Sequence, residues 1–227
     1  MTDPKLDLTI DRPSESVPEM VVRRIRDAIA AGLLPPGRQL TERELVELTG
    51  VSRTSVREAM RHLQTLGLVE PSPSRGVRVA RLGRDEVREI YEVRDALEPA
   101  VAELFVLRAT DEEVAALVEK VQPRPSGDKR MQAIYEFDEL LLAGARNSLL
   151  KSMLEPLHTR IHALRSLSVT IPGRHEASRQ EYLDIAEAIA ARSPERASEA
   201  AHRHVRAAAK AALQAVEILE KEHPKKS

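Results

Sequence analysis

Apolar residues recur at three- and four-residue spacing along most of this chain, which predicts a protein built largely from α-helices. In the first part of the chain, three helices are expected to begin after Ser16, Thr41 and Ser52, because each hydroxyl group can accept a hydrogen bond from a first-turn amide. Glu19 and Glu44 follow Ser16 and Thr41 by three residues, so the first two helices should begin with a reciprocal capping box.

The second and third of these helices are joined by very few residues, since Gly50 ends one and Ser52 begins the next. Helices connected so closely must cross steeply, as in a helix-turn-helix motif. A β-hairpin is expected next, with strands at residues 68–70 and 77–80, and residues 38–40 can pair with it as a short strand. A helix-turn-helix followed by a hairpin predicts a winged helix, whose last helix enters the major groove of DNA.

The rest of the chain predicts six or seven helices without a convincing strand. They are expected at residues 85–109, 110–121, 128–145, 147–168, 176–191 and 194–222. The fold class is therefore mostly α: an N-terminal winged helix-turn-helix with a small β-hairpin wing, and a C-terminal all-α antiparallel helical bundle. The expected organisation is a disordered arm at residues 1–16, a DNA-binding domain at 17–80, a linker at 81–84, the bundle at 85–222 and a tail at 223–227.

Composition and charge narrow the possible function classes. The chain has no Cys, which excludes disulfide bonds and thiolate metal sites. The sequence shows neither an apolar signal core nor a segment able to span a bilayer, so a cytoplasmic location without a membrane partner is expected. The net charge is only -1, but residues 17–80 hold ten Arg against seven acidic residues, and residues 85–122 hold eleven acidic residues against four basic ones. Positive charge is thus concentrated where DNA contact is expected.

Polar side chains crowd the start of the third helix. They are Ser52, Arg53, Thr54, Ser55 and Arg57. Hydroxyl and guanidinium groups at a helix N-terminus can reach both phosphates and base edges in a groove. The same residues could also form an ordinary solvated helix face, and the predicted wing favours the DNA-contact interpretation.

The first half of the chain resembles a known family. The segment IRDAIAAGLLPPGRQLTERELVELTGVSRTSVREAMRHLQTLGLV is similar to the winged-helix domain of the GntR family of bacterial transcription regulators. The resemblance implies that Arg43, Arg53 and Arg57 contact a double-stranded DNA operator, supported by Ser52, Thr54 and Ser55. It also implies that Gly76, preceded by Arg75, enters the minor groove at the tip of the wing.

The second half resembles the FCD effector domain that defines the FadR subfamily of GntR regulators. The segments that carry the resemblance are IYEVRDALEPAVAEL, EFDELLLAGARNSLL and QEYLDIAEAIAARSPERASEAAHRHV. Many domains of this type hold a divalent metal with one Asp and three His. By motif, Asp138 and His204 match two of these ligands, whereas Leu142 and Tyr182 stand at the other two positions. One carboxylate and one imidazole are too few for a stable site, so we expect no metal and no other cofactor.

Asp138, Tyr182 and His204 could instead fix the polar end of an effector, or Asp138 and His204 could form a buried hydrogen-bonded pair without a ligand. Arg94 is a candidate anchor for a carboxylate or phosphate, because guanidinium binds such groups in a bidentate fork; a structural ion pair is the alternative.

A further polar cluster lies on one face of the helix predicted at residues 147–168. His158, His162 and Arg165 are spaced i, i+4 and i+7. These side chains are expected to line the effector pocket or to form a solvated edge. Two His at i, i+4 can also bind zinc, although no Glu follows the first His as in zincin enzymes.

The combined pattern predicts a homodimeric transcription regulator, most simply a repressor, that binds a palindromic operator and responds to a small organic acid or acyl derivative. Two alternatives stay open at this point. One is an architectural DNA binder without an effector, and the other is a helical-bundle metalloenzyme, for which the sequence offers no nucleophile and only a depleted ligand set.

Overall fold

The computed structural model describes residues 15–30, 32–72, 76–122, 127–168 and 171–222. Contacts between residues divide the chain into two compact units. The first holds residues 34–80 together with the preceding chain up to Ala28, and the second holds residues 81–227 with the short segment Ile29–Leu33. Each unit is described here by itself.

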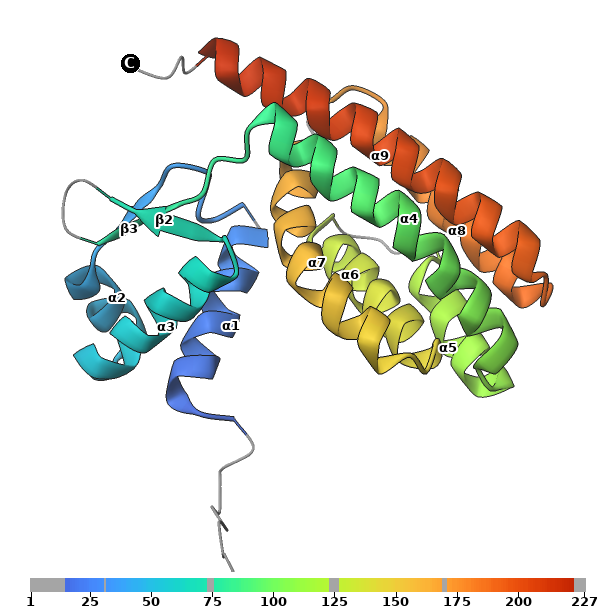
Figure 1. Ribbon diagram of the computed structural model, residues 1–227, viewed down its shortest axis with the longest axis horizontal. Coiled ribbons are helices and arrows are strands. Elements are labelled where there is room, and N and C mark those ends of the chain that lie inside the picture. Colours follow the sequence, from blue (N-terminus) through green and yellow to red (C-terminus); the bar gives the residue numbers. More distant parts are fainter. Residues whose placement is uncertain (1–14, 31, 73–75, 123–126, 169–170, 223–227) are drawn as a thin grey trace, which may run out of the picture. The chain divides into compact units, whose positions relative to one another are not determined.

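Within its described residues, the first unit holds three helices and a small antiparallel sheet (Figure 1). Its elements are α1 (Val17–Ala30), β1 (Gln39–Leu40), α2 (Glu42–Thr49), α3 (Arg53–Thr65), β2 (Val69–Pro71) and β3 (Val77–Val79). The strand order is β1-β3-β2, so the hairpin β2-β3 forms the wing and β3 is the central strand, which also pairs with β1. This arrangement confirms the predicted winged helix-turn-helix, including the short strand before α2.

The capping residues explain where these helices begin. Ser16 and Glu19 form the predicted reciprocal box, and Ser52 Oγ accepts a hydrogen bond from the Ser55 amide. Thr41 Oγ1 accepts from the Glu44 amide, but the Glu44 carboxylate accepts from Arg38 Nη2 at 2.6 Å. The predicted box at α2 is therefore wrong in its second half, because a nearby guanidinium competes for the carboxylate.

The second unit is a helical bundle (Figure 1). In the part of the chain that the structure describes, its helices are α4 (Arg84–Arg108), α5 (Asp111–Lys120), α6 (Gly127–Gly144), α7 (Ser148–Ser168), α8 (Arg174–Ala190) and α9 (Pro194–Glu222). The two longest, α4 and α9, run side by side, and α8 also packs along α9. The mostly helical fold with six bundle helices confirms the prediction.

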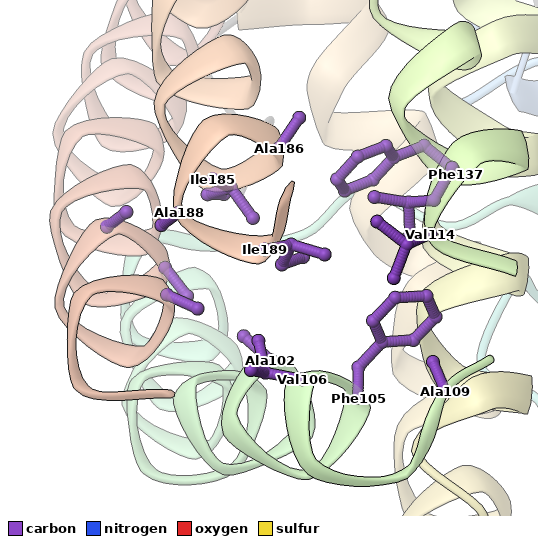
Figure 2. Packing of buried hydrophobic residues seen from close by; sticks show 14 of the residues in the cluster. Ala102, Phe105, Val106, Ala109, Val114, Phe137, Ile185, Ala186, Ala188 and Ile189 are labelled. Carbon is purple, nitrogen blue, oxygen red and sulfur yellow. The ribbon is translucent and has the colours of Figure 1, made fainter. Parts of the chain in front are cut away.

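The main apolar core of the bundle joins α4, α5, α6, α8 and α9 (Figure 2). Phe105 and Phe137 are its largest apolar side chains, and Ile189 is fully buried beside them. Gly144 closes α6 where a β-carbon would lie 2.3 Å from the Phe105 ring, so only glycine allows this close approach. Alanines of α8 and α9 also belong to this core and let these two helices pack closely.

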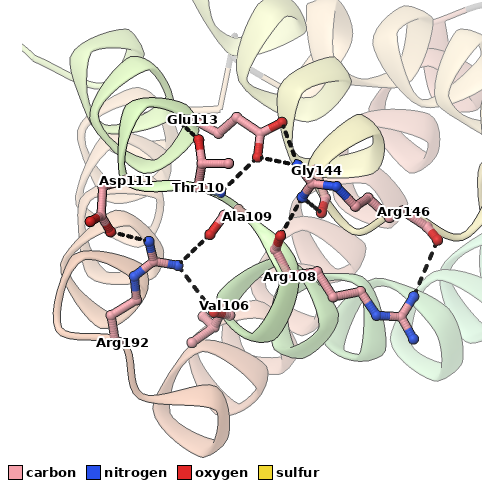
Figure 3. Close-up of polar contacts among 9 residues, drawn as sticks. All are labelled: Val106, Arg108, Ala109, Thr110, Asp111, Glu113, Gly144, Arg146 and Arg192. Atoms are coloured by element: carbon pink, nitrogen blue, oxygen red, sulfur yellow. Dashed lines mark hydrogen bonds and ion pairs between the residues drawn. The ribbon is translucent and has the colours of Figure 1, made fainter.

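Arginine side chains close one end of the bundle (Figure 3). Arg192 Nη1 donates to the carbonyls of Val106 and Ala109, at 3.2 and 2.8 Å, and thereby satisfies the C-terminal end of α4. Arg146 donates to the Arg108 carbonyl and pairs with Glu113 at 2.9 Å. Both Arg146 (φ 47°) and Arg192 (φ 52°) follow a helix in the left-handed conformation that usually favours glycine. Their hydrogen bonds to helix ends offset that strain.

Candidate DNA-binding face and polar bundle core

The N-terminal turn of α3 presents its polar side chains to solvent. Ser52, Arg53 and Thr54 are exposed. On the opposite face of the helix, Val56 and Leu63 are fully buried against the rest of the first unit. Because the apolar face fixes the rotation of the helix, the hydroxyl and guanidinium groups face outward. This is the geometry that direct contact with a DNA groove requires.

Three more predicted DNA-contacting residues flank this turn. Ser55 is half-buried, and its hydroxyl lies 3.0 Å from that of Ser52. Arg57 Nε donates to Glu42 Oε1 at 2.8 Å while its side chain stays 60% exposed. The hydrogen bond raises the pKa of Arg57 and lowers the pKa of Glu42. Arg43 is 85% exposed and lies 3.9 Å from Glu47. Exposed ion pairs of this kind are weak, so both guanidinium groups can exchange their partner for a phosphate.

The tip of the wing is described only in part. Arg75 lies outside the described residues. Gly76 has φ 117°, and a β-carbon there would lie 2.4 Å from the Leu40 carbonyl oxygen. Glycine is therefore required for the close approach of β3 to β1, which is a structural reason independent of DNA.

In the second unit, Arg94 is buried and bound to a carboxylate of its own helix. Its Nε and Nη2 donate to the two oxygens of Glu98 at 2.7 and 3.0 Å, and His158 Nε2 lies 3.3 Å from Glu98 Oε1. Burial alone would lower the pKa of Arg94, but the charge and hydrogen bonds of Glu98, together with Tyr91 and Tyr182, outweigh burial and raise that pKa. Conversely, burial would raise the pKa of Glu98, and Arg94 and His158 hold it well below its usual range.

A second buried group surrounds Arg165 of α7. Nη1 and Nη2 donate to Asp138 Oδ2 at 3.2 and 3.3 Å, and Nη2 also donates to the Tyr182 hydroxyl at 2.6 Å. The Tyr182 hydroxyl donates in turn to Asp138 Oδ1 at 3.2 Å. Arg165 Nη1 lies 3.2 Å from His162 Nδ1, and since guanidinium only donates, Nδ1 must be the acceptor. Burial alone would lower the pKa of Arg165, but the neighbouring Tyr182 and Asp138 raise it above its ordinary value.

A third group contains His204 of α9. Its Nδ1 lies 2.8 Å from Glu181 Oε2, and Arg174 pairs with both oxygens of Glu181 at 2.5 and 2.8 Å. Burial lowers the pKa of His204, so the imidazole is neutral, with Nδ1 donating to Glu181. The three groups are neighbours, because the His204 ring packs against the Tyr182 ring with centroids 4.6 Å apart, and the His158 and His162 ring centroids are 6.3 Å apart.

Comparisons with known proteins decide the family. Residues 18–79 match the model of bacterial regulatory proteins of the gntR family, and residues 89–207 match the FCD domain model. Over 206 residues the chain is 30% identical to YdhC of Bacillus subtilis, an HTH-type transcriptional regulator, covering 88% of this chain and 90% of that relative. The chain belongs to the GntR family.

Other matches agree with this assignment. The GntR-family chain is 28% identical over 199 residues to the HTH-type transcriptional repressor RspR of Escherichia coli, covering 85% of this chain and 87% of the repressor. Its fold matches the solved structure of McbR/YncC from E. coli with a TM-score of 0.75 at 23% identity, covering 92% of this chain and 99% of that chain. The protein is thus a DNA-binding transcription regulator with an FCD domain. Family membership excludes the metalloenzyme alternative, because these relatives are regulators and not enzymes.

The bundle of this GntR regulator does not fit a divalent metal at the positions that the FCD resemblance assigns. Leu142 is buried in an apolar cluster with Val101, Ala145 and Leu154. Both carboxylate oxygens of Asp138 accept hydrogen bonds from Arg165 or Tyr182. Among the described residues, no three His, Asp or Glu side chains are grouped so that they could hold a metal ion.

The structure brings all seven effector candidates together in one polar core and adds partners that the sequence analysis did not select. The candidates near one another are Asp138, His158, His162, Arg165, Tyr182 and His204, and Arg94 joins them through Glu98 and His158. The missed partners are Glu98, Glu181 and Arg174. Glu98 could have been found by its i, i+4 spacing from Arg94, and Arg174 and Glu181 are seven residues apart, which places both on one face of α8.

Two other features complete the description of the second unit. An open hollow of about 530 Å³ is lined by residues at the start of α4 and by Glu220, and none of the effector candidates lines it. No helix within the described residues has both the length and the apolar character needed to traverse a bilayer.

Proposed function

We propose that this GntR-family protein is a repressor of the FadR subfamily that binds a palindromic operator as a homodimer and responds to a small organic acid or acyl derivative. The FCD domain supports the subfamily, since this domain defines it. The observation that carries the DNA part is the outward-facing first turn of α3, where Ser52, Arg53 and Thr54 are exposed on a rigid helix.

On this proposal, α3 lies in the major groove and its N-terminal turn reads the sequence. Arg53 and Arg57 contact bases or phosphates there, supported by the hydroxyl groups of Ser52, Thr54 and Ser55. Arg43 binds the backbone from α2. Arg75 and Gly76 at the wing reach the minor groove. A single winged helix buries too little surface for specific occupancy of a genome, so two copies and a palindrome are needed.

Arg53→Ala tests the assignment of α3. The operator is first selected from a random duplex library with the wild-type protein, and affinity is then measured by fluorescence anisotropy at fixed salt. Loss of one bidentate base contact is expected to weaken specific binding by roughly 1–3 kcal/mol, about fivefold to 150-fold. Because Arg53 is exposed, the melting temperature should stay unchanged.

Arg203→Ala is the matched control, since it removes an exposed arginine (57% exposed) from the FCD unit. It should bind the operator like the wild type. A duplex cut to one half-site should bind far more weakly than the full palindrome. Equal affinity of Arg53→Ala and Arg203→Ala would refute the DNA-contact assignment, and equal affinity for the half-site would refute the dimer.

The effector is proposed to bind at the polar core of the bundle, without a metal. Two buried nitrogens of the described core, His158 Nδ1 and His204 Nε2, have no hydrogen-bond partner. Buried polar atoms rarely lack a hydrogen-bond partner, so a ligand that reaches these two nitrogens would form hydrogen bonds with them. Arg94 and Arg165 supply positive charge, although each is already paired with a carboxylate. An acidic effector would therefore have to compete with Glu98 or Asp138 for a guanidinium.

A further inference from the structure

The centre of the polar core contains a positive charge that belongs to the chain itself. Arg165 is buried, and its guanidinium reaches Asp138, Tyr182 and His162 at hydrogen-bond distance. Asp138 and Tyr182 stand at two of the four positions to which the FCD resemblance assigns metal ligands. The side chains at these two positions therefore surround a guanidinium.

We infer that the guanidinium of Arg165 replaces the divalent metal as the resident cation of this FCD domain. The carboxylate supports this first. Asp138 Oδ2 accepts from both Nη1 and Nη2, and Oδ1 accepts from the Tyr182 hydroxyl. A metal ion would need to approach a carboxylate oxygen to about 2.0–2.2 Å, which the guanidinium and the phenol prevent while they are bound there.

The two replaced ligand positions support the same inference. Leu142 is 3% exposed and packs with Leu154 and Val101, so it contributes to the apolar core instead of a coordination sphere. The Tyr182 hydroxyl accepts a hydrogen bond from Arg165 Nη2 and donates one to Asp138 Oδ1, so it is already occupied on both sides. A neutral phenol suits a hydrogen-bonded guanidinium and is a poor ligand for a divalent ion.

Charge balance also favours a single cation. Arg165 and Asp138 neutralise each other, and Arg94 and Glu98 form a second neutral pair close by. A divalent ion added beside these two pairs would bring two positive charges into a medium of low dielectric constant, with neither carboxylate free to balance them. The arginine thus disfavours the metal by charge as well as by its hydrogen bonds to Asp138.

One of the histidines that the FCD resemblance assigns as metal ligands is retained in this chain. His204 is held through Nδ1 by Glu181, and its Nε2 is buried with no hydrogen-bond partner in the described structure. Metal-binding histidines are usually oriented in this way by a carboxylate on the second nitrogen. Removal of Arg165 and restoration of two histidines should therefore be enough to rebuild a four-ligand site around His204 and Asp138.

The test uses the full chain and divalent metal ions as the only probes. Wild-type protein and the variant with Leu142→His, Tyr182→His and Arg165→Met are titrated with Zn²⁺ and Ni²⁺ by calorimetry, and metal content is measured after dialysis. The wild type should hold far less than one ion per chain, and a chelator should leave its melting temperature unchanged. The triple variant should bind one ion per chain, at least tenfold more tightly, and melt at a higher temperature with metal than with chelator.

His204→Gln in the triple variant is the control for location, because it removes one rebuilt ligand and should weaken metal binding at least tenfold. The wild-type measurement does not depend on the folding of any variant. One tightly held ion per wild-type chain that is lost in Asp138→Asn would overturn the inference. A triple variant that folds, as judged by circular dichroism, but binds no more metal than the wild type would also overturn it.

Discussion

At the residue scale, the bundle core is governed by the pairing of buried charges. Each buried arginine of the core faces a carboxylate: Arg94 with Glu98, Arg165 with Asp138, and Arg174 with Glu181. An unpaired ion in such surroundings costs several kcal/mol, whereas a satisfied pair is close to neutral. The Arg165–Asp138 pair joins α7 to α6, whereas the other two pairs lie within α4 and within α8, so the pairs neutralise buried charge more than they add net stability.

Glu98→Gln tests this view. It leaves the buried Arg94 guanidinium without its carboxylate, so we expect a loss of about 3–5 kcal/mol in the free energy of unfolding, measured by urea denaturation at neutral pH. The double variant Arg94→Met, Glu98→Gln removes both charges and should lose less than the single variant. A single variant as stable as the wild type would show that the pair does not neutralise a buried charge.

The same pair predicts a dependence on pH. Burial would raise the pKa of Glu98, but Arg94 and His158 lower it below its usual value of 4.5. A carboxyl group with a lowered pKa contributes stability above its unfolded pKa and loses it as the pH falls toward the folded pKa. The stability difference between wild type and Glu98→Gln should therefore be constant above about pH 5 and shrink at lower pH.

At the scale of elements, the wing depends on one glycine. Gly76→Ala would place a β-carbon 2.4 Å from the Leu40 carbonyl oxygen, at φ 117°. The pairing of β1 with β3 would have to open, so we expect a lower melting temperature, a loss of more than about 1 kcal/mol, and weaker operator binding. Gly83→Ala is the matched control, because a β-carbon there meets nothing within 4 Å. Similar effects of both substitutions would count against a special role for Gly76.

Element boundaries were predictable because local chemistry sets them. Ser16, Ser52 and Thr110 cap their helices through their own hydroxyl groups, and Gly50 ends α2 with φ 70°. The Thr41 box failed in part because Arg38 captures the Glu44 carboxylate, a contact that sequence spacing does not reveal. Capping residues in the sequence therefore predict where helices begin and end. The hydrogen-bond partner of an individual side chain also depends on residues that only the folded structure brings near it.

The DNA-binding face could be predicted from the sequence more fully than the polar core of the bundle, because the first depends on local spacing and the second on contacts between helices. The polar turn of α3 follows from one helix and its apolar face, so its outward orientation could be derived from spacing. The core groups join residues from separate helices, such as Arg165 of α7 with Asp138 of α6 and Tyr182 of α8. The resemblance placed Asp138 and Tyr182 at one site, but only tertiary packing brings Arg165 to them. The role of Arg165 as their shared cation could not be derived from one sequence.

At the scale of the whole molecule, a repressor needs its FCD unit to influence its DNA-binding unit. A ligand changes an equilibrium only by its differential affinity for two states of the protein, and the coupling is reciprocal. If an acid binds at the polar core, its carboxylate must displace Glu98 from Arg94 or Asp138 from Arg165. These arginines belong to α4 and α7, and His158 of α7 also contacts Glu98. Such an exchange would shift these helices relative to one another.

This coupling predicts the response of the full chain to small organic acids and acyl derivatives. A ligand that binds the folded state raises the melting temperature, so a thermal-shift screen should identify the effector class. The same compound should change operator affinity by roughly 5-fold to 150-fold, and operator DNA should change its affinity by the same factor. His204→Gln should weaken the thermal shift, because it alters the buried Nε2 that is proposed to meet the effector. A compound that shifts the melting temperature without changing operator affinity would favour an architectural DNA binder whose bundle holds a ligand without regulatory effect.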